Sequence, residues 1–203
     1  MQLAPGVKPA RASWRLHIGS RPQVPGRHRG RTVADVTSES SPPDGNVAVP
    51  AIPASAGALI FDRSGRLLIL KPTYKSGWTI PGGVMEADGE TPWQACRREV
   101  REECGIDLRH GRLACVDFRR PRPGSPGGIR FLFDCGTVDD ACLAAITVQA
   151  AEISEYRLAA MPEALQLLRR PIRRRVRAAT AGRALVYLEQ GRRVAGVGKR
   201  RGK

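Results

Sequence analysis

The chain has 203 residues, of which 41% are hydrophobic, and a formal net charge of +15. This composition allows one packed domain with tails and excludes a wholly disordered chain. No apolar run approaches the roughly 18 residues that cross a bilayer, so we expect no membrane partner. The charge lies in the flanks, because residues 1–53 carry +4 and residues 164–203 carry +12, whereas residues 54–163 carry −1. The basic flanks are therefore the candidate region for binding nucleic acid.

Composition also divides the chain along its length. Residues 1–53 are rich in Pro, Gly and Arg, and we expect a disordered leader there. The folded domain is expected over residues 54–193, followed by a basic disordered tail over residues 194–203. The five cysteines form no C-x-x-C pair, which favours reduced thiols and a cytoplasmic protein. Both a monomer and a homodimer remain open.

Local patterns predict the elements of the domain in order. The apolar runs 57–61 and 66–70 predict a hairpin of two strands, and residues 77–80 a third short strand. Residues 81–89 are glycine-rich and predict a loop. A helix is predicted to start at Thr91, with Pro92 in its first position and Gln94 completing a capping box, and to end at Gly105. The remaining predictions are strands near 113–119, 129–135 and 155–158, and a helical region over 161–181 that Pro171 interrupts. This order of elements predicts a single α/β domain.

The helix after Thr91 carries three carboxylates on one side. Glu99, Glu102 and Glu103 stand at i, i+3 and i+4, within an arc of roughly 100°. Crowded carboxylates repel one another unless a cation lies among them, and Mg²⁺ or Mn²⁺ prefers such oxygen ligands. The alternative is a solvated face whose charge is balanced by the arginines of the same helix.

The segment before this helix favours a ligand site. Gly82 and Gly83 permit a close approach of the backbone to a ligand, and Glu86 and Glu90 add two more carboxylates.

Together these residues resemble a known motif. Glu90, seven intervening residues and then Arg98-Glu-Val-Arg-Glu-Glu-Cys-Gly-Ile106 are similar to the Nudix box, G-x5-E-x7-R-E-U-x-E-E-x-G-U, in which U is a bulky aliphatic residue. One departure is that six residues, not five, separate Gly83 from Glu90, which lengthens the loop ahead of Thr91. With the order of the surrounding elements, the sequence from residue 54 to about residue 193 resembles bacterial Nudix hydrolases.

The resemblance implies a fold and an activity. It implies an α/β/α sandwich with a mixed β-sheet that hydrolyses a pyrophosphate bond in a nucleoside diphosphate linked to another moiety, with Mg²⁺ or Mn²⁺. It also implies that Glu99, Glu102 and Glu103 bind the metal and that Arg98 orients these glutamates. Gly82, Gly83, Glu86 and Glu90 would support metal or substrate. The alternative is a non-catalytic Nudix-fold module that binds nucleotides or nucleic acid.

Two questions stay open in the sequence. The general base is either Glu99 or a glutamate of a late loop, for which Glu152 and Glu155 are candidates. The arginines of residues 169–177 are either the outer face of a docked helix or a surface for a phosphate-rich partner such as RNA.

Overall fold

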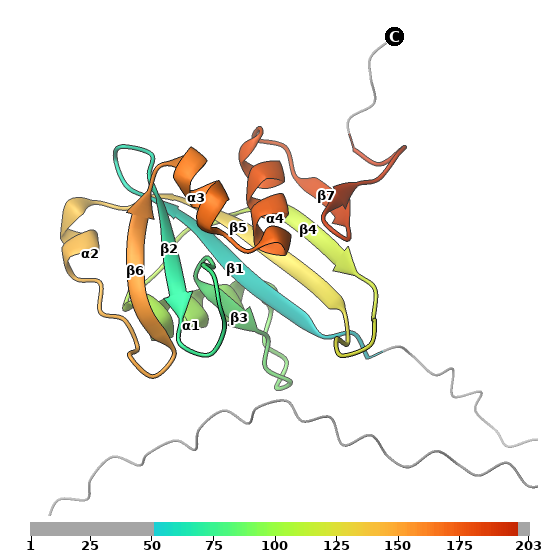
Figure 1. Cartoon of the computed structure of the whole chain (residues 1–203), viewed down its shortest axis with the longest axis horizontal. Coiled ribbons are helices and arrows are strands. Elements are labelled where there is room, and N and C mark those ends of the chain that lie inside the picture. Colours follow the sequence, from blue (N-terminus) through green and yellow to red (C-terminus); the bar gives the residue numbers. More distant parts are fainter. Residues whose placement is uncertain (1–50, 199–203) are drawn as a thin grey trace, which may run out of the picture. The chain divides into compact units, whose positions relative to one another are not determined.

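The computed structural model describes residues 51–198, and the predictions for the remainder of the leader and for residues 199–203 lie outside these residues. The described residues form one mixed sheet with helices on both faces (Figure 1). The strands are β1 (Ala54–Phe61), β2 (Leu67–Pro72), β3 (Gly82–Val84), β4 (Arg112–Arg119), β5 (Gly128–Thr137), β6 (Ile153–Ala159), β7 (Val186–Glu189) and β8 (Arg192–Arg193). The helices are α1 (Pro92–Cys104), α2 (Asp140–Ala144), α3 (Met161–Leu167) and α4 (Arg170–Thr180).

Strand β1 is the centre of the sheet, whose order is β6-β2-β1-β5-β4-β7-β8 with β3 also paired to β1. One edge of β1 runs parallel to β5. The other edge is shared, because residues 55–57 pair with β3 and Phe61 pairs with Leu67 of β2. This division places β3, and the loop that leads to α1, in the middle of the sheet.

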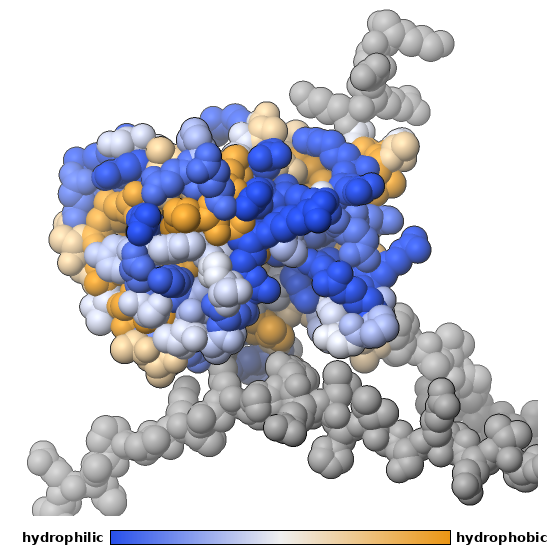
Figure 2. Space-filling view, in the orientation of Figure 1, coloured by the Kyte–Doolittle hydropathy of each residue, from blue (hydrophilic) through white to orange (hydrophobic). Residues whose placement is uncertain are grey.

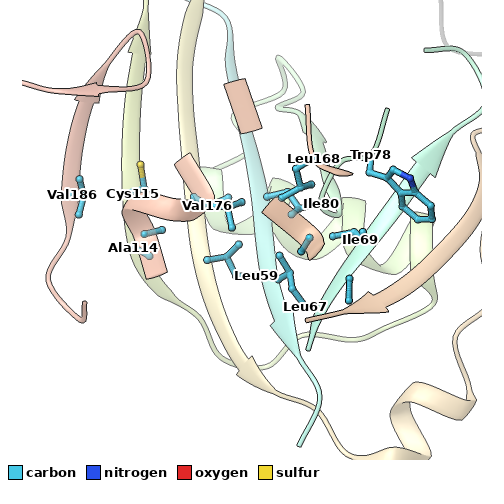
Figure 3. Close-up of a cluster of buried hydrophobic side chains, with 14 of the residues drawn as sticks. Leu59, Leu67, Ile69, Trp78, Ile80, Ala114, Cys115, Leu168, Val176 and Val186 are labelled. Carbon is cyan, nitrogen blue, oxygen red and sulfur yellow. The ribbon is translucent and has the colours of Figure 1, made fainter. Parts of the chain in front are cut away.

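Side chains of β1 and β2 alternate between two cores. Leu59, Leu67 and Ile69 pack with Leu168 and Val176 against α3 and α4 (Figure 3). The neighbouring residues Ile60, Leu68 and Leu70 pack with Val100 of α1 on the opposite face. Strands covered on both faces read as continuous apolar runs, which is how they stand in the sequence. The predicted α/β/α sandwich with a mixed sheet is therefore confirmed.

Helix α1 begins and ends as its sequence predicts. Thr91 Oγ1 accepts a hydrogen bond from Gln94 N, and Gln94 Oε1 accepts one from Thr91 N, which completes the capping box. Gly105 closes the helix in the left-handed conformation, and its N–H donates to the carbonyl of Arg101. These caps fix where α1 begins and ends, and its buried residues Cys96, Val100 and Cys104 turn one side of it to the sheet.

Several predicted elements differ from the structure. The prediction of a loop over 81–89 is wrong for Gly82–Val84, which pair with β1 as β3. Within 77–80, only isolated bridges form instead of a strand. The helical region breaks at residues 168–169, and Pro171 lies in the first turn of α4, where its missing N–H is not needed. Helix α2 and the hairpin of β7 and β8 were absent from the predicted elements. No helix in the described part of the chain is long and apolar enough to cross a membrane.

Candidate active site

Helix α1 turns two carboxylates into the interior. Glu99 is 2% exposed and Glu103 is 6% exposed, whereas the side chain of Glu102 is 40% exposed. Glu99 and Glu103 are four residues apart and therefore lie on one face, which packs against β1 and β3. The solvated-face interpretation fails for these two residues and fits only Glu102.

Arg98 joins four parts of the site. Its Nε and Nη2 bind the two carboxylate oxygens of Glu90 at 2.7 and 2.9 Å. Its Nη1 donates to Glu99 at 2.8 Å and to Glu102 at 3.3 Å, while Nη2 also donates to the carbonyl of Val84 at 3.1 Å. The hydrogen bonds with Glu90, followed by those with Glu99, raise the pKa of Arg98 above its usual value, although burial opposes this. One planar guanidinium thus fixes three glutamates relative to β3.

The loop between β3 and α1 is held by hydrogen bonds to and from Glu90. The N–H of Glu86 donates to Glu90 Oε2 at 2.8 Å, and the N–H of Glu90 donates to Asp88 Oδ1 at 3.1 Å. The carboxylate of Glu86 is exposed and lies 4.0 Å from Arg98 Nε, at the rim of the network. The additional residue relative to the Nudix pattern is therefore accommodated between Val84 and Glu90, and Gly83 keeps its place in β3.

The two glycines of β3 allow α1 to come close. A Cβ on Gly83 would lie 2.3 Å from Cδ of Glu99, so only glycine leaves room for this carboxylate. Gly82, at φ +140, lies against Ala56 and Gly57 of β1, and its N–H donates to Glu103 Oε2 at 2.7 Å. Each glycine thus positions one buried glutamate.

Glu103 lies where a negative charge is costly. Its pKa is raised to about 8, chiefly by burial and in addition by the charges of Glu99 and Glu152, while the hydrogen bond from Gly82 and the charge of Lys75 partly oppose the shift. A carboxylate in such surroundings favours either a proton or a cation as its partner.

Of the late-loop candidates, Glu152 lies near the helix glutamates. Its charge acts on Glu103, and its carbonyl accepts a hydrogen bond from the N–H of Thr73, which joins its loop to the end of β2. Glu155 instead pairs with Lys71 at 3.7 Å and Arg157 at 3.1 Å on the surface. The structure therefore brings Glu152, but not Glu155, to the α1 carboxylates.

Sequence reasoning missed two basic residues near this site. Lys75 was not singled out, although it follows β2 in the segment that leads to β3. Arg175 of α4 lines a cavity of about 90 Å³ together with Arg130, and this cavity is bordered by Gly82 and Gly83. Arg175 belongs to the basic run of residues 169–177, which the sequence left open between an outer face and a surface for a phosphate-rich partner, and neither interpretation predicted its place beside Gly82.

The donor set suits a hard divalent cation. Glu99, Glu102 and Glu103 offer only oxygen ligands, and the raised pKa of Glu103 marks a place where positive charge is favourable. Among the described residues no group of three or more His, Cys, Asp or Glu side chains is gathered closely enough to hold a metal. Arg98 binds Glu99 and Glu102 instead, and the N–H of Gly82 binds Glu103. The residues thus fit Mg²⁺ or Mn²⁺ by chemistry, with Arg98 in the position of the balancing cation.

The sequence of this chain matches the model of a known domain family. The model of the NUDIX domain matches residues 51–179, which run from just before β1 nearly to the end of α4. The chain belongs to the NUDIX family. The match stops before β7 and β8.

Individual relatives match smaller parts of this chain than the family model does. A MutT-like protein of Streptomyces ambofaciens is 38% identical over 95 residues, which are 47% of this chain and 58% of that protein. An 8-oxo-dGTP diphosphatase of Proteus vulgaris is 42% identical over 57 residues, which are 26% of this chain and 50% of that protein. Among solved structures, the MutT protein from Methanosarcina mazei Go1 has a TM-score of 0.51 at 27% identity, covering 60% of this chain and 87% of that one. The chain thus spans between half and three fifths of the length of the two curated relatives.

Proposed function

We propose that the chain hydrolyses a pyrophosphate bond in a nucleoside diphosphate linked to another moiety, with Mg²⁺ or Mn²⁺ bound by Glu99, Glu102 and Glu103. The observation that carries the proposal is the buried pair Glu99 and Glu103 beside Gly82 and Gly83. Burying two carboxylates on one helix face is costly, and a site for a cation and a phosphate explains why the chain does so. The relatives named a MutT-like protein and an 8-oxo-dGTP diphosphatase support a nucleotide-type substrate.

The residues of the chain divide the work. Arg98 holds Glu99, Glu102 and Glu90 in a fixed arrangement, so that the carboxylates need not reorganise when substrate binds. Arg130 and Arg175 line the cavity beside Gly82, and because Arg175 is already paired with Asp117, Arg130 is the arginine of this cavity that provides positive charge for a phosphate. A bound divalent cation would supply the charge that offsets the negative pyrophosphate oxygens.

Two glutamates are candidates for the base that takes a proton from the attacking water. Glu99 is buried and already bound to Arg98, which commits its carboxylate to the network. Glu152 is half-buried and its charge acts on Glu103 from a separate loop, which supports it as the base. An E152Q variant that lowers kcat with little change in KM would assign the proton transfer to Glu152, and unchanged kinetics would assign it to the α1 carboxylates.

Turnover of a substrate panel tests the proposal. Purified full-length chain is incubated with nucleoside triphosphates, 8-oxo-dGTP, ADP-ribose, NADH and dinucleoside polyphosphates, with Mg²⁺, with Mn²⁺ and with EDTA. We expect metal-dependent release of phosphate or nucleotide from at least one compound, and its loss in the E102Q/E103Q variant. Turnover equal to that of this variant on every compound would contradict the proposal and favour the non-catalytic binding module.

A further inference from the structure

Helix α4 carries more positive charge than a helix that only docks on a sheet requires. Five of its 11 residues are arginines, whereas Ile172, Val176 and Ala179 pack toward the sheet. Arg175 is the inward one, since it lines the cavity beside Gly82 and bonds to Asp117 at 3.2 Å. Arg170 and Arg177 are exposed, and Arg174 lies between them along the same side.

A second wall faces these arginines across two cavities. One cavity, of about 440 Å³, lies between α4 and Arg119, Arg122 and Arg192. The other, of about 470 Å³, lies between α4 and Arg193 of β8. The two cavities share Arg170, Arg174 and Gly191, so they adjoin. We call these joined cavities the arginine groove; Figure 2 shows strongly hydrophilic residues gathered over α4 and the neighbouring edge of the sheet.

The walls of the arginine groove are held in place by specific contacts. The β7–β8 turn has positive φ at both Gln190 and Gly191, and the N–H of Gly191 donates to the buried Asp117 at 2.8 Å. The side chain of Arg174 packs over Gly191, where a Cβ would lie 3.0 Å from its Cδ. Arg174 Nη1 also reaches the carbonyl of Gln190 at 3.4 Å. The groove is therefore a built feature that does not depend on side chains alone.

The charge within the groove is unbalanced. Of the described residues that line it, Asp117 is the single carboxylate, and it is 1% exposed and already bound to Arg175 and Gly191. Helix α4 has no acidic residue in its first turn, where the helix dipole favours negative charge. Arginines at i, i+3 and i+4 repel one another as well, so the helix is less stable than a neutral one. A negatively charged ligand removes both costs.

We propose that the arginine groove binds the sugar–phosphate backbone of a single-stranded nucleic acid. Two adjoining cavities lined along their length by arginine suit a chain of phosphates better than one isolated phosphate. A concave basic surface also suits a strand better than a flat anionic membrane. Because the proposed contacts are to phosphates and not to base edges, binding is expected to be independent of base sequence. The second wall uses β8, which lies beyond the NUDIX match, so the proposal concerns this chain and does not rest on hydrolysis.

Salt-dependent binding to RNA tests the groove. A fluorescently labelled 5′-hydroxyl oligouridylate of twelve residues is titrated with the full chain in EDTA, and anisotropy is recorded at several salt concentrations. The R170Q/R177Q/R192Q variant removes three exposed groove arginines, and R63Q/R97Q/R109Q removes three exposed arginines elsewhere as a control of equal charge. Circular dichroism melting verifies that both variants fold.

We expect the groove variant to bind at least tenfold more weakly than the wild type at low salt. The slope of log affinity against log salt should fall by about 2, because each lost phosphate contact on a single strand accounts for about 0.7. The control variant should bind like the wild type. Equal weakening by both variants, unchanged binding by the groove variant, or no binding by the wild type would overturn the proposal. Binding to phosphatidylglycerol vesicles is measured in parallel. If the groove variant loses binding to these vesicles but retains binding to RNA, the proposal is overturned in favour of a membrane surface as the partner.

Discussion

Helices α1 and α4 lie on opposite faces of one sheet and use their charges in opposite ways. In α1 the glutamates at 99 and 102 are paired with Arg98, and two of its three glutamates are buried or nearly so. In α4 only Arg175 has a carboxylate partner among the described residues, while Arg170 and Arg177 are exposed to solvent. The first is a balanced network in which each group fixes the next. The second is an array of like charges in which each exposed arginine acts weakly on several others.

This difference sets how each helix should respond to substitution. Removing one member of a buried network leaves its partners charged and unpaired, so single changes in α1 should be severe. Removing one member of a solvated array weakens an interaction that is shared by many groups, so changes of the exposed arginines of α4 should be small and additive.

The largest loss of stability is expected for Arg98→Gln. This change leaves Glu90 and Glu99, which are 9% and 2% exposed in their side chains, without their cation. The free energy of unfolding should fall by about 3 kcal/mol, measured by urea denaturation. Arg97→Gln is the matched control, because Arg97 is the preceding residue of α1 and pairs with Asp107 on the surface, so it should cost under about 0.5 kcal/mol. Similar losses in both variants would refute the network.

Gly83→Ala should impair activity more than stability. The new Cβ would lie within 2.5 Å of the carboxylate of Glu99 and displace it. A displacement of this kind costs about 100-fold in kcat, or about 2.7 kcal/mol in the barrier. Gly182→Ala is the control, because its Cβ would meet nothing within 4 Å. Steady-state rates on the substrate found in the panel provide the measurement, and a fully active G83A enzyme would remove Glu99 from the site.

The stability of the metal-free protein should depend on pH through Glu103. Its pKa is about 8 in the folded state against 4.5 as the ordinary value, so the unfolded state loses this proton first. The contribution of Glu103 to the free energy of unfolding is therefore fully present below pH 4.5 and is lost as the pH rises toward 8. Glu103→Gln keeps the acceptor for Gly82 and should be more stable than the wild type at pH 9, by on the order of 2 kcal/mol, but not at pH 4.5.

Urea denaturation in EDTA at these two pH values measures the effect. Glu163→Gln, at an exposed glutamate paired with Arg157, is the control and should follow the wild type. A parallel decline of the wild type and E103Q with pH would show that another group is responsible.

The smallest effect is expected on α4. Arg170→Gln/Arg177→Gln should raise the free energy of unfolding by about 0.5 kcal/mol at low salt, because it removes like-charge repulsion with Arg173 and Arg174. The gain should vanish at high salt, where such repulsion is screened. Urea denaturation at two salt concentrations tests this, and a destabilised variant would mean that these arginines make structural contacts.

Sequence patterns predicted the structural features that are determined by residues close together in the chain. The limits of α1 follow from Thr91 and Gly105, whose capping depends on residues within one turn. Strands β1 and β2 were visible as apolar runs since both of their faces are covered. The identity of the candidate glutamates came from their spacing on this helix.

Features that depend on contacts between distant parts of the chain were not predicted. Gly82 and Gly83 read as a loop by composition, and they form β3 only because β1 offers an unpaired edge there. The burial of Glu99 follows from that pairing, since Gly83 lies against its carboxylate. The arginine groove likewise joins Arg119 of β4 to Arg192 of β8, which no local pattern connects. Strand β7 did have a signal, the alternation of Val186 and Leu188 with polar neighbours, but it is only four residues long.

Direct binding of Mn²⁺ tests the central claim that the α1 carboxylates form a cation site. The loss of the free Mn²⁺ electron paramagnetic resonance signal is followed as the metal is added to wild type, to E102Q/E103Q and to the surface control E163Q. We predict saturable binding by the wild type and E163Q, and at least tenfold weaker binding by E102Q/E103Q. Equal Mn²⁺ affinity in all three proteins would contradict the assignment of these glutamates.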